Sequence, residues 1–313
     1  MQVNDLIFKE LVKRGYSLEG RTRIWNIADS KLWYLTPEQA QGFLDLEQGK
    51  EYKKEIIQKE IDLIDKHMPT IMKEVDVDKS INIVDLGCGD GKKAVLFIEN
   101  LDENINIRYC PIDISGYMVQ KAMDRIGKLH KGEVVDFQYN ISDFDNLENI
   151  ASLLRKKDYP KNFFLLLGNT LGNFEINDLL YSISSSMREG DYVLIGNGLD
   201  NRNYEDIVNS YKEPVVDKWL FKITNQIGLT KEDIEFGARF RNGRVELYYS
   251  LLKDKKVTFQ DKSIYFNKGD QIIVSVSYKY SKEEFEEFMH LYFRRVKIFA
   301  SKDNSYVLAL CGK

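Results

Sequence analysis

Residues Ile81–Ile98, INIVDLGCGDGKKAVLFI, give the clearest indication of the fold in this sequence. An apolar strand pattern ends in the glycines Gly87, Gly89 and Gly91, and a helix pattern follows them. A turn that lacks side chains lets a ligand lie against bare backbone, and the amide groups at the helix start attract its negative charge. The stretch therefore predicts a strand, a ligand-binding turn and a helix of a Rossmann-like sheet.

A second segment indicates which kind of ligand the turn binds. The run YCPIDIS (Tyr109–Ser115) predicts a strand that ends in Asp113, where a carboxylate is placed to accept from ribose hydroxyls. The glycine spacing is G-x-G-x-G rather than the dinucleotide fingerprint G-x-G-x-x-G, and Asp85 precedes it, as is common in enzymes that use S-adenosylmethionine (SAM). The pattern favours SAM; NAD and a glycine turn without a ligand remain as alternatives.

The composition excludes several classes of function. Of 313 residues, 43% are hydrophobic and 30% charged, which is ordinary for a soluble globular protein, and the net charge of −4 gives no basic field for nucleic acid or an anionic membrane. Cys88, Cys110 and Cys311 show no metal-ligand spacing, so no metal is expected. With no signal-peptide pattern and no apolar run near the roughly 20 residues of a membrane span, we expect a cytoplasmic protein.

Strand and helix patterns alternate through the middle of the chain. The run FFLLL (Phe163–Leu167) is continuously apolar, which predicts a strand buried on both faces, as in a parallel sheet. The alternation predicts a doubly wound α/β fold. The expected strands and helices are Ile81–Leu86, Ala94–Asn100, Ile107–Ile112, Tyr117–Ile126, Val134–Tyr139, Leu147–Lys156, Asn162–Leu167, Leu179–Met187 and Tyr192–Gly196.

The flanking segments have different patterns. Residues up to about Thr70 are expected to be mostly helical, with one apolar stripe along Lys50–Met68. Between these parts, Trp25–Gly49 is expected to be loop and a short helix that starts at Thr36 and Pro37. After Asp200 the sequence predicts a helix over Trp219–Ile227 and alternating runs of antiparallel strands.

The last patterns are a helix over Lys282–Leu291 and a hairpin, Arg295–Ala300 and Tyr306–Leu310, which is expected to rejoin the sheet. We therefore expect a SAM-binding Rossmann-like domain over residues 71–200 plus 276–313. Residues 1–70 plus 201–275 are expected to form a second, discontinuous α+β domain that binds the substrate.

Two more segments carry candidate site residues. Asp143 and Phe144 follow the third predicted strand, where an acid and an apolar ring contact the adenine in SAM folds; a turn or N-cap aspartate is the alternative. The run LLLGNTLGNFE places Gly168, Asn169 and Asn173 after a buried strand, at the edge where open α/β sheets bind ligands. A left-handed turn residue is the alternative for Asn169.

These segments resemble the histidine-specific, SAM-dependent N-methyltransferases that make the trimethyl betaine of histidine in ergothioneine synthesis, and their fungal relatives that methylate tryptophan-derived amines. The resemblance covers nearly the whole chain, and LGNTLGNF, similar to the family's LGxTIGNF, is its most specific match. It implies that Lys93 contacts the SAM carboxylate and that Asp113 binds the ribose. It also implies that Asp143 and Phe144 bind the adenine, and that Asn173 binds the amino-acid end of the substrate.

The resemblance also implies residues that bind the substrate. Tyr34 in WNIADSKLWYLT and Tyr211 in NSYKEP stand where the family has substrate-binding tyrosines; an ordinary amphipathic tyrosine is the alternative for each. The family reads the imidazole with E-V-S, whereas this chain has Ser275-Val276-Ser277. The second serine is kept and the glutamate is lost, so the departure concerns the identity of the acceptor.

The sequence thus predicts a SAM-dependent N-methyltransferase that acts on the amine of an amino acid or an amino-acid derivative. A methyltransferase of another small molecule or peptide is the alternative, as is a SAM-binding protein without catalysis. No catalytic base is indicated, because His67, His130 and His290 stand in surface or packing contexts. The sequence does not indicate an oligomeric state.

Overall fold

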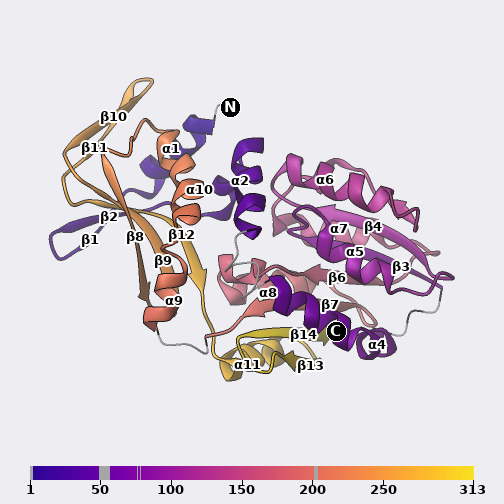
Figure 1. Ribbon diagram of the computed structural model, residues 1–313. Coiled ribbons are helices and arrows are strands. Elements are labelled where there is room, and N and C mark those ends of the chain that lie inside the picture. Colours follow the sequence, from indigo (N-terminus) through magenta and orange to yellow (C-terminus); the bar gives the residue numbers. More distant parts are fainter. Residues whose placement is uncertain (1–2, 49–56, 76, 78, 201–203) are drawn as a thin grey trace. The chain divides into compact units, whose positions relative to one another are not determined.

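The computed structural model describes residues 3–48, 57–75, 77, 79–200 and 204–313, which form two compact units (Figure 1). The core unit comprises Lys50–Asn201 and Lys279–Lys313, and the accessory unit comprises Met1–Gly49 and Arg202–Tyr278. Both are discontinuous in sequence. No helix in the described ranges is long and apolar enough to cross a membrane.

A seven-stranded sheet with the order β13-β14-β7-β6-β3-β4-β5 organises the core unit. Its central strands are parallel, whereas β14 pairs antiparallel with β7 and β13 pairs antiparallel with β14. The expected closing hairpin therefore rejoins the sheet, and the Rossmann-like α/β fold is confirmed. The strands are β3 (Ser80–Leu86), β4 (Asn106–Ile112), β5 (Glu133–Val134), β6 (Asn162–Leu166), β7 (Tyr192–Gly198), β13 (Arg295–Ala300) and β14 (Tyr306–Gly312).

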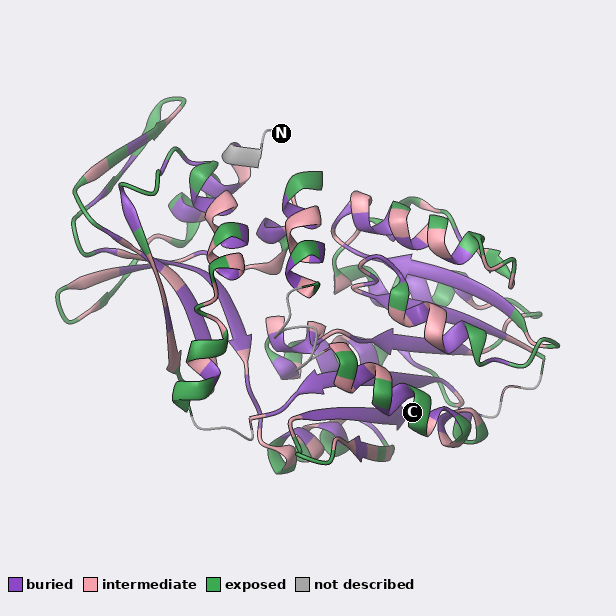
Figure 2. Ribbon diagram, in the orientation of Figure 1, coloured by how far each residue is buried: buried purple, intermediate pink, exposed green. Residues whose placement is uncertain are grey.

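The central strands are buried along their length, and the helices that flank the sheet turn a buried stripe inward (Figure 2). In β6, Phe163 and Leu165 belong to the apolar cluster that α4, α5 and α6 form with one face of the sheet. Phe164 and Leu166 alternate with them and are also fully buried, so both faces are covered. The helices are α4 (Gln58–Val75), α5 (Lys92–Glu99), α6 (Gly116–Gly127), α7 (Leu147–Leu154), α8 (Ile176–Ser186) and α11 (Lys282–Tyr292).

The helix α4 changes the division expected at residue 70. The expected helix Lys50–Met68 begins in residues that lie outside the described ranges, and α4 extends it to Val75. Leu63, Ile64 and Met68 join the apolar cluster of the core sheet, which places residues 50–70 in the core unit rather than with the N-terminal segment. The other unit in turn extends to Tyr278, because β12 continues to that residue.

The strand expected over Val134–Tyr139 is shorter than the pattern suggested. Strand β5 ends at Val134, and a 3₁₀ turn covers Gln138–Asn140. The Asn140 side chain accepts from the Phe137 amide at 2.6 Å and donates to the carbonyl of Pro111 at 2.7 Å. These bonds take backbone groups that a longer strand would use, so the strand ends early.

The accessory unit contains a five-stranded sheet with the order β1-β2-β12-β9-β8, in which β2 and β12 pair in parallel and the other neighbours pair antiparallel. Its helix α2 starts as expected: Thr36 and Gln39 form a reciprocal capping box, and Pro37 is the first helical residue. The elements are α1 (Val3–Arg14), β1 (Ser17–Glu19), β2 (Thr22–Asn26), the 3₁₀ turn η1 (Ser30–Trp33), α2 (Pro37–Glu47), α9 (Tyr204–Ser210), α10 (Pro214–Asn225), β8 (Ile234–Arg241), β9 (Arg244–Leu251), β10 (Lys255–Phe259), β11 (Lys262–Phe266) and β12 (Gln271–Tyr278).

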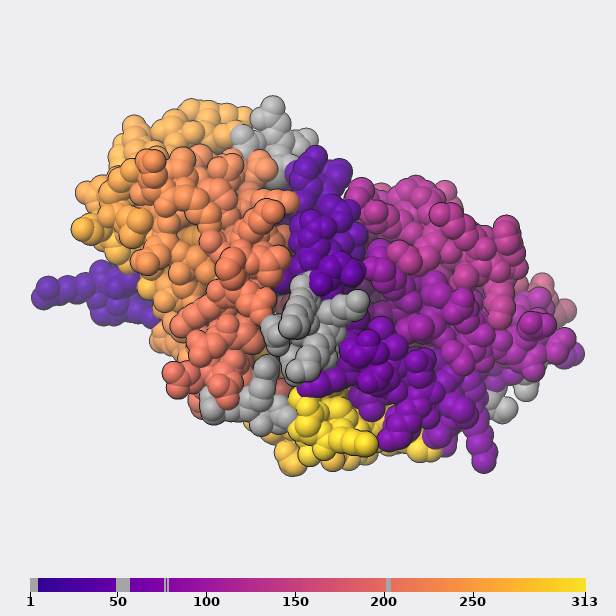
Figure 3. Space-filling model, in the orientation of Figure 1, coloured from indigo at the N-terminus to yellow at the C-terminus, as the bar shows by residue number. Residues whose placement is uncertain are grey.

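The hairpin β1–β2 contradicts the expectation that the residues before the loop and short helix of Trp25–Gly49 are helical. The hairpin projects from the accessory unit (Figure 3), and Leu18 near its tip is 67% exposed. Its inner strand pairs with β12, where Ile24 lies opposite Gln271 and Trp25 opposite Ile272. This partner lies near the other end of the chain, so no local pattern could indicate the pairing.

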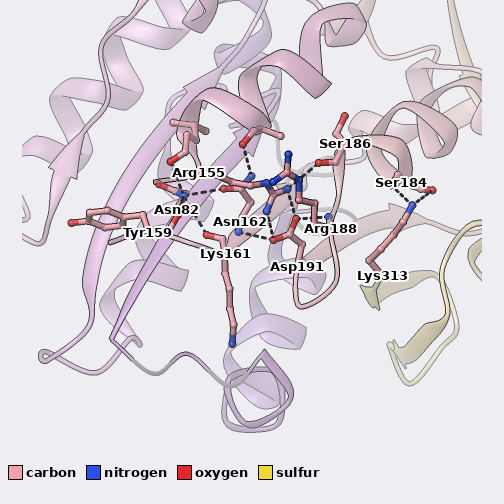
Figure 4. Close-up of polar contacts among 12 residues, drawn as sticks. Asn82, Arg155, Tyr159, Lys161, Asn162, Ser184, Ser186, Arg188, Asp191 and Lys313 are labelled. Carbon is pink, nitrogen blue, oxygen red and sulfur yellow. Dashed lines mark hydrogen bonds and ion pairs between the residues drawn. The ribbon is translucent and has the colours of Figure 1, made fainter. Parts of the chain in front are cut away.

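A buried polar network joins β3, β6 and β7 at the amino ends of the parallel strands (Figure 4). Asp191, 1% exposed, accepts from Arg155 at 2.8 Å and from the backbone amides of Asn162 and Arg188, also at 2.8 Å. The Asn82 side chain donates to the side-chain oxygen of Asn162 at 2.9 Å. The network lies at the opposite edge of the sheet from the glycine turn, where it links the amino ends of β3, β6 and β7.

We expect Asp191→Ala to lower the free energy of unfolding by about 3–5 kcal/mol, because the buried guanidinium of Arg155 loses the carboxylate with which it pairs. Urea denaturation measures the change. Glu74→Ala removes an ion pair to Lys297 in which both side chains are largely exposed, and is expected to change stability little. An Asp191→Ala variant as stable as the Glu74→Ala variant would contradict the assignment.

Candidate active site

The glycine turn begins directly after β3 and leads into α5. Gly87, Gly89 and Gly91 all have positive φ, of 66°, 52° and 76°. A Cβ atom at Gly89 would meet no heavy atom within 4 Å, whereas one at Gly91 would lie 3.0 Å from the Cα of Ala122 on α6. Gly91 also serves as the N-cap of α5 and offers no side chain to its first amide groups. The turn thus presents bare backbone and a helix start at the carboxyl edge of the sheet.

Asp113 stands directly after β4 and is tied to this turn. Its carboxylate accepts from the Gly89 amide at 3.1 Å and from the Ser115 amide at 2.9 Å. Burial raises the pKa of Asp113 to about 6, although these backbone amides favour the ionised form. The structure therefore brings Gly89 and Asp113 together, as the two motifs predicted.

Lys93 and Gly168, from distant parts of the sequence, meet at a third residue that the sequence analysis did not identify. Glu60 of α4 is fully buried and accepts from the Gly168 amide at 2.9 Å, and the Lys93 ammonium lies 3.4 Å from its other oxygen. Gly168 has a φ of 76°, a left-handed conformation that favours glycine, and a Cβ atom there would require the Lys93 ammonium to move. A signal existed in the sequence, since position 60 falls on the apolar stripe that Ile57 and Ile64 define.

Asp85 is the acidic residue of β3 and lies two residues before Gly87 of the glycine turn. It is 4% exposed and accepts from the Tyr109 hydroxyl at 2.7 Å. Burial raises the pKa of Asp85 to about 7, and the charges of Asp113 and Glu60 act in the same direction, whereas Lys93 opposes them. Three carboxylates therefore share this edge of the sheet with Lys93, which suits a ligand that carries positive charge.

Asp143 and Phe144 lie in a 3₁₀ turn after the third parallel strand. Asp143 caps the turn, because one of its carboxylate oxygens accepts from the Asp145 amide at 3.2 Å. Phe144 has its ring centroid 5.3 Å from that of Phe174. Phe174 directly follows Asn173, so the two predicted segments are neighbours.

The two asparagines of LGNTLGNF differ in their surroundings. Asn169 has a φ of 63° and accepts from the Gly198 amide at 2.9 Å, which makes it the left-handed turn residue that ties the segment to β7. Asn173 is half-buried at the end of a 3₁₀ turn, and its side chain makes no hydrogen bond to the described part of the chain. That side-chain amide therefore remains able to bind a ligand.

In the accessory unit, the structure brings Tyr211 and Ser277 into contact. The Tyr211 hydroxyl donates to the Ser277 hydroxyl at 2.9 Å. Ser275 and Ser277 are 4% and 5% exposed and alternate along β12, so they share one face of the sheet. A tyrosine from the helical segment and the serines of β12 thus meet on this face.

Tyr34 ends the 3₁₀ turn η1 and lies among aromatic rings. Its ring centroid is 5.4 Å from that of Phe43 and 6.1 Å from that of Trp219. The neighbouring Trp33 donates its indole N–H to the carbonyl of Val274 at 2.9 Å. Because Val274 precedes Ser275, this bond fixes η1 beside the predicted substrate-binding part of β12.

The histidines occupy packing or surface positions. His67 stacks on Phe299 with centroids 4.4 Å apart, and burial lowers its pKa. His290 is exposed on α11, 4.0 Å from the carboxylate of Glu286. His130 has a φ of 52° in the turn after α6. These contacts tie the histidines to packing and surface groups rather than to the predicted site residues.

Comparison with known proteins supplies the family. The model of the histidine-specific, SAM-dependent methyltransferases matches residues 41–313. No curated protein matches the sequence. Among solved structures, the PH0226 protein from Pyrococcus horikoshii OT3 is 12% identical with a TM-score of 0.45, over 88% of this chain and 99% of that one.

Two further structures have similar scores. DesVI from Streptomyces venezuelae is 11% identical with a TM-score of 0.38, over 88% of this chain and 98% of that one. DhpI, solved in a complex with SAM and HEP, is 13% identical with a TM-score of 0.40, over 87% and 97%. With TM-scores this low, the family assignment does not depend on them. The family model covers most of the chain, including all the predicted cofactor residues, and the chain therefore belongs to the histidine-specific, SAM-dependent methyltransferase family.

Proposed function

We propose that the protein transfers the methyl group of SAM to the amine of an amino acid or an amino-acid derivative. In this proposal, the core unit binds SAM at the glycine turn and contributes Asn173 to acceptor binding. Tyr34, Tyr211 and Ser277 of the accessory unit are assigned to the acceptor from the family resemblance. The observation that carries it is the contact between Tyr211 and Ser277 at 2.9 Å, because it pairs two residues that the family resemblance implied separately.

The residues at the carboxyl edge of the core sheet fit SAM. The backbone at Gly89 is open, and the Asp113 carboxylate bonded to it is placed to accept from ribose hydroxyls. The ammonium of Lys93, at the start of α5, suits the one carboxylate that SAM carries. Phe144 contacts Phe174, the last residue of LGNTLGNF. In the proposal, Asp143 accepts from the adenine amine and Phe144 packs on the adenine ring.

When bound, SAM supplies an electrophilic methyl group, whose carbon–sulfur bond breaks as the acceptor nitrogen bonds to carbon and the electron pair stays on sulfur. The protein's part is to position the amine in line with that bond, which accounts for most of the acceleration. An aliphatic amine has a pKa of roughly 9 to 10, so it must first lose a proton. The histidines pack elsewhere, and we assign this loss to water before binding.

The acceptor differs from histidine in this proposal, because the chain lacks the glutamate that reads the imidazole. Glu246 does not replace it: it lies directly opposite Val276, so it shares the face of Val276 and not that of Ser275 and Ser277. It also bonds to Arg239 and Arg244 at 2.8 Å each. A serine in place of the glutamate supports the second candidate, a small molecule or peptide without an imidazole.

Product analysis tests the proposal. The protein is incubated with SAM and, separately, each of the twenty amino acids, their decarboxylated amines and a set of short peptides, and the products are identified by mass spectrometry. We expect adenosylhomocysteine together with methylation of an amine on an amino acid other than histidine. Methylation of histidine alone would overturn the assigned specificity, and methylation only of oxygen or carbon would overturn the assigned acceptor.

The affinity for SAM is expected to fall below pH 6. Burial raises the pKa of Asp113 to about 6, and only its ionised form accepts from both ribose hydroxyls, so the dissociation constant is expected to rise about tenfold between pH 7 and pH 5. Unfolding does not explain such a fall. A raised carboxyl pKa stabilises the folded state most below the ordinary value of about 4 and loses this effect as the pH rises past 6.

Isothermal titration with adenosylhomocysteine at several pH values measures this dependence. In Asp113→Asn, which cannot ionise, the affinity should be lower but flat over the same range. The same slope in both proteins would assign the titration to another group, such as Asp85.

A further inference from the structure

Glu60 is an unusual residue for its place in the fold. It lies in the first turn of α4, where a negative charge is favoured, but its side chain is fully buried, as is that of Ile64 one turn later. A buried carboxylate is costly unless it is paired and hydrogen-bonded. The partners that it has therefore indicate what it does.

Its hydrogen-bond donors come from the carboxyl edge of the core sheet. The Gly168 amide, after β6, lies 2.9 Å and 3.1 Å from the two carboxylate oxygens, and the Tyr306 hydroxyl, at the start of β14, donates at 2.6 Å. A Cβ atom at Gly196 of β7 would collide with the carboxylate, so glycine at that position leaves room for it. Residues of β7 and β14, and the residue that follows β6 closely, therefore all contact the Glu60 carboxylate or leave space for it.

A further partner, Lys93, links Glu60 to the proposed cofactor site. Its ammonium lies 3.4 Å from Glu60, and its side chain is 19% exposed. A flexible lysine without such a fixed neighbour samples many rotamers, and ordering it on binding would cost affinity. Asp113 follows β4, which lies across β3 from β6 and Gly168, and suits the ribose, whereas Lys93 suits the anionic end of the ligand.

We infer that Glu60 is a positioning residue for the amino-acid end of SAM. Its carboxylate fixes the Lys93 ammonium and the Gly168 amide, so that the carboxylate and ammonium of the ligand's amino-acid end meet an ordered site. The inference rests on the proposed cofactor site. It predicts that Glu60 contributes to the recognition of the amino-acid end and not of the adenosine.

Two ligands distinguish recognition of the amino-acid end from recognition of the adenosine. Adenosylhomocysteine carries the amino-acid end, and methylthioadenosine lacks it. We expect Glu60→Gln to weaken adenosylhomocysteine by about tenfold or more, and to change methylthioadenosine by less than about threefold, in isothermal titration. Lys92→Met is the matched control, because Lys92 is the exposed neighbour of Lys93 and pairs with Asp90 instead; both ligands should bind to it as to the wild type.

A double-mutant comparison shows whether Glu60 acts through the lysine. In the Lys93→Met background, Glu60→Gln should no longer change the ratio of the two affinities. Equal weakening of both ligands by Glu60→Gln would assign Glu60 a purely structural role and overturn the inference, as would no weakening of either. If Glu60→Gln does not fold, Tyr306→Phe, which removes one donor to Glu60, decides: an unchanged ratio contradicts the inference.

These outcomes are distinct from a failure of the proposed site. If the wild-type protein binds both ligands and Asp113→Asn weakens both, the site is in place whatever Glu60 does. If Asp113→Asn weakens neither, the cofactor site itself is wrong.

Discussion

Asp113→Ala is expected to weaken the binding of adenosylhomocysteine by about 100-fold or more. Hydrogen bonds to a charged group contribute about 1.5–3 kcal/mol each, and two ribose hydroxyls donate to this carboxylate in the proposed site. A loss of about 3 kcal/mol corresponds to about 100-fold in affinity. Isothermal titration of the variant against the wild type measures it.

The effect must be separated from damage to the glycine turn, because Asp113 also accepts from the Gly89 and Ser115 amides. Asp113→Asn keeps an acceptor for one of these amides and removes the charge, so it should fold normally and still bind about tenfold more weakly. Asp124→Asn removes an exposed carboxylate from α6 and should bind as the wild type does. Unchanged affinity in the Asp113→Asn variant would show that the carboxylate does not bind the ligand.

The second large effect is expected for Asn173→Ala, which should lower kcat/KM for the methyl acceptor by about 100-fold or more. A misplacement of the reacting atoms by about 1 Å already has an effect of this size. Adenosylhomocysteine should bind within about threefold of the wild type, because Asn173 is assigned to the acceptor and not to the cofactor. Steady-state kinetics and titration on the same preparation measure both.

Asn104→Ala is the control for Asn173, since Asn104 is exposed and bonds to Asp102 within its own turn. It should retain full activity. Full activity in the Asn173→Ala variant would remove Asn173 from the acceptor site, and a matching loss of cofactor affinity would reassign it to the cofactor.

The sequence predicted well what local patterns encode. Gly89 and Asp113 each follow the end of a strand, and because the carboxyl ends of parallel strands meet at one edge, their contact followed from the fold. The helix at Thr36 and Pro37 followed from capping chemistry within a few residues. In these cases the determining interactions lie close together in the sequence or follow from the strand order.

Long-range pairing decided what the sequence did not predict. The hairpin β1–β2 forms because Ile24 and Trp25 pair with β12, near the other end of the chain. Residues 50–70 belong to the core unit because α4 packs on the core sheet. Both results depend on segments that meet only in the folded chain.

Glu60 was missed for a related reason. Its position on the apolar stripe was visible, but its partners Gly168 and Tyr306 come from segments far along the chain. The sequence therefore showed a charged residue at a buried helical position but did not show which residues bind it. The roles of Tyr34, Tyr211 and Ser275 came from the family resemblance, and they stay predictions.

A crystal structure of the protein with adenosylhomocysteine would show where the cofactor binds. We expect both ribose hydroxyls within hydrogen-bond distance of the Asp113 carboxylate, the sugar against the backbone of Gly89, and the ligand's carboxylate at the Lys93 ammonium. A ligand bound elsewhere, or one whose ribose faces away from Asp113, would contradict this expectation.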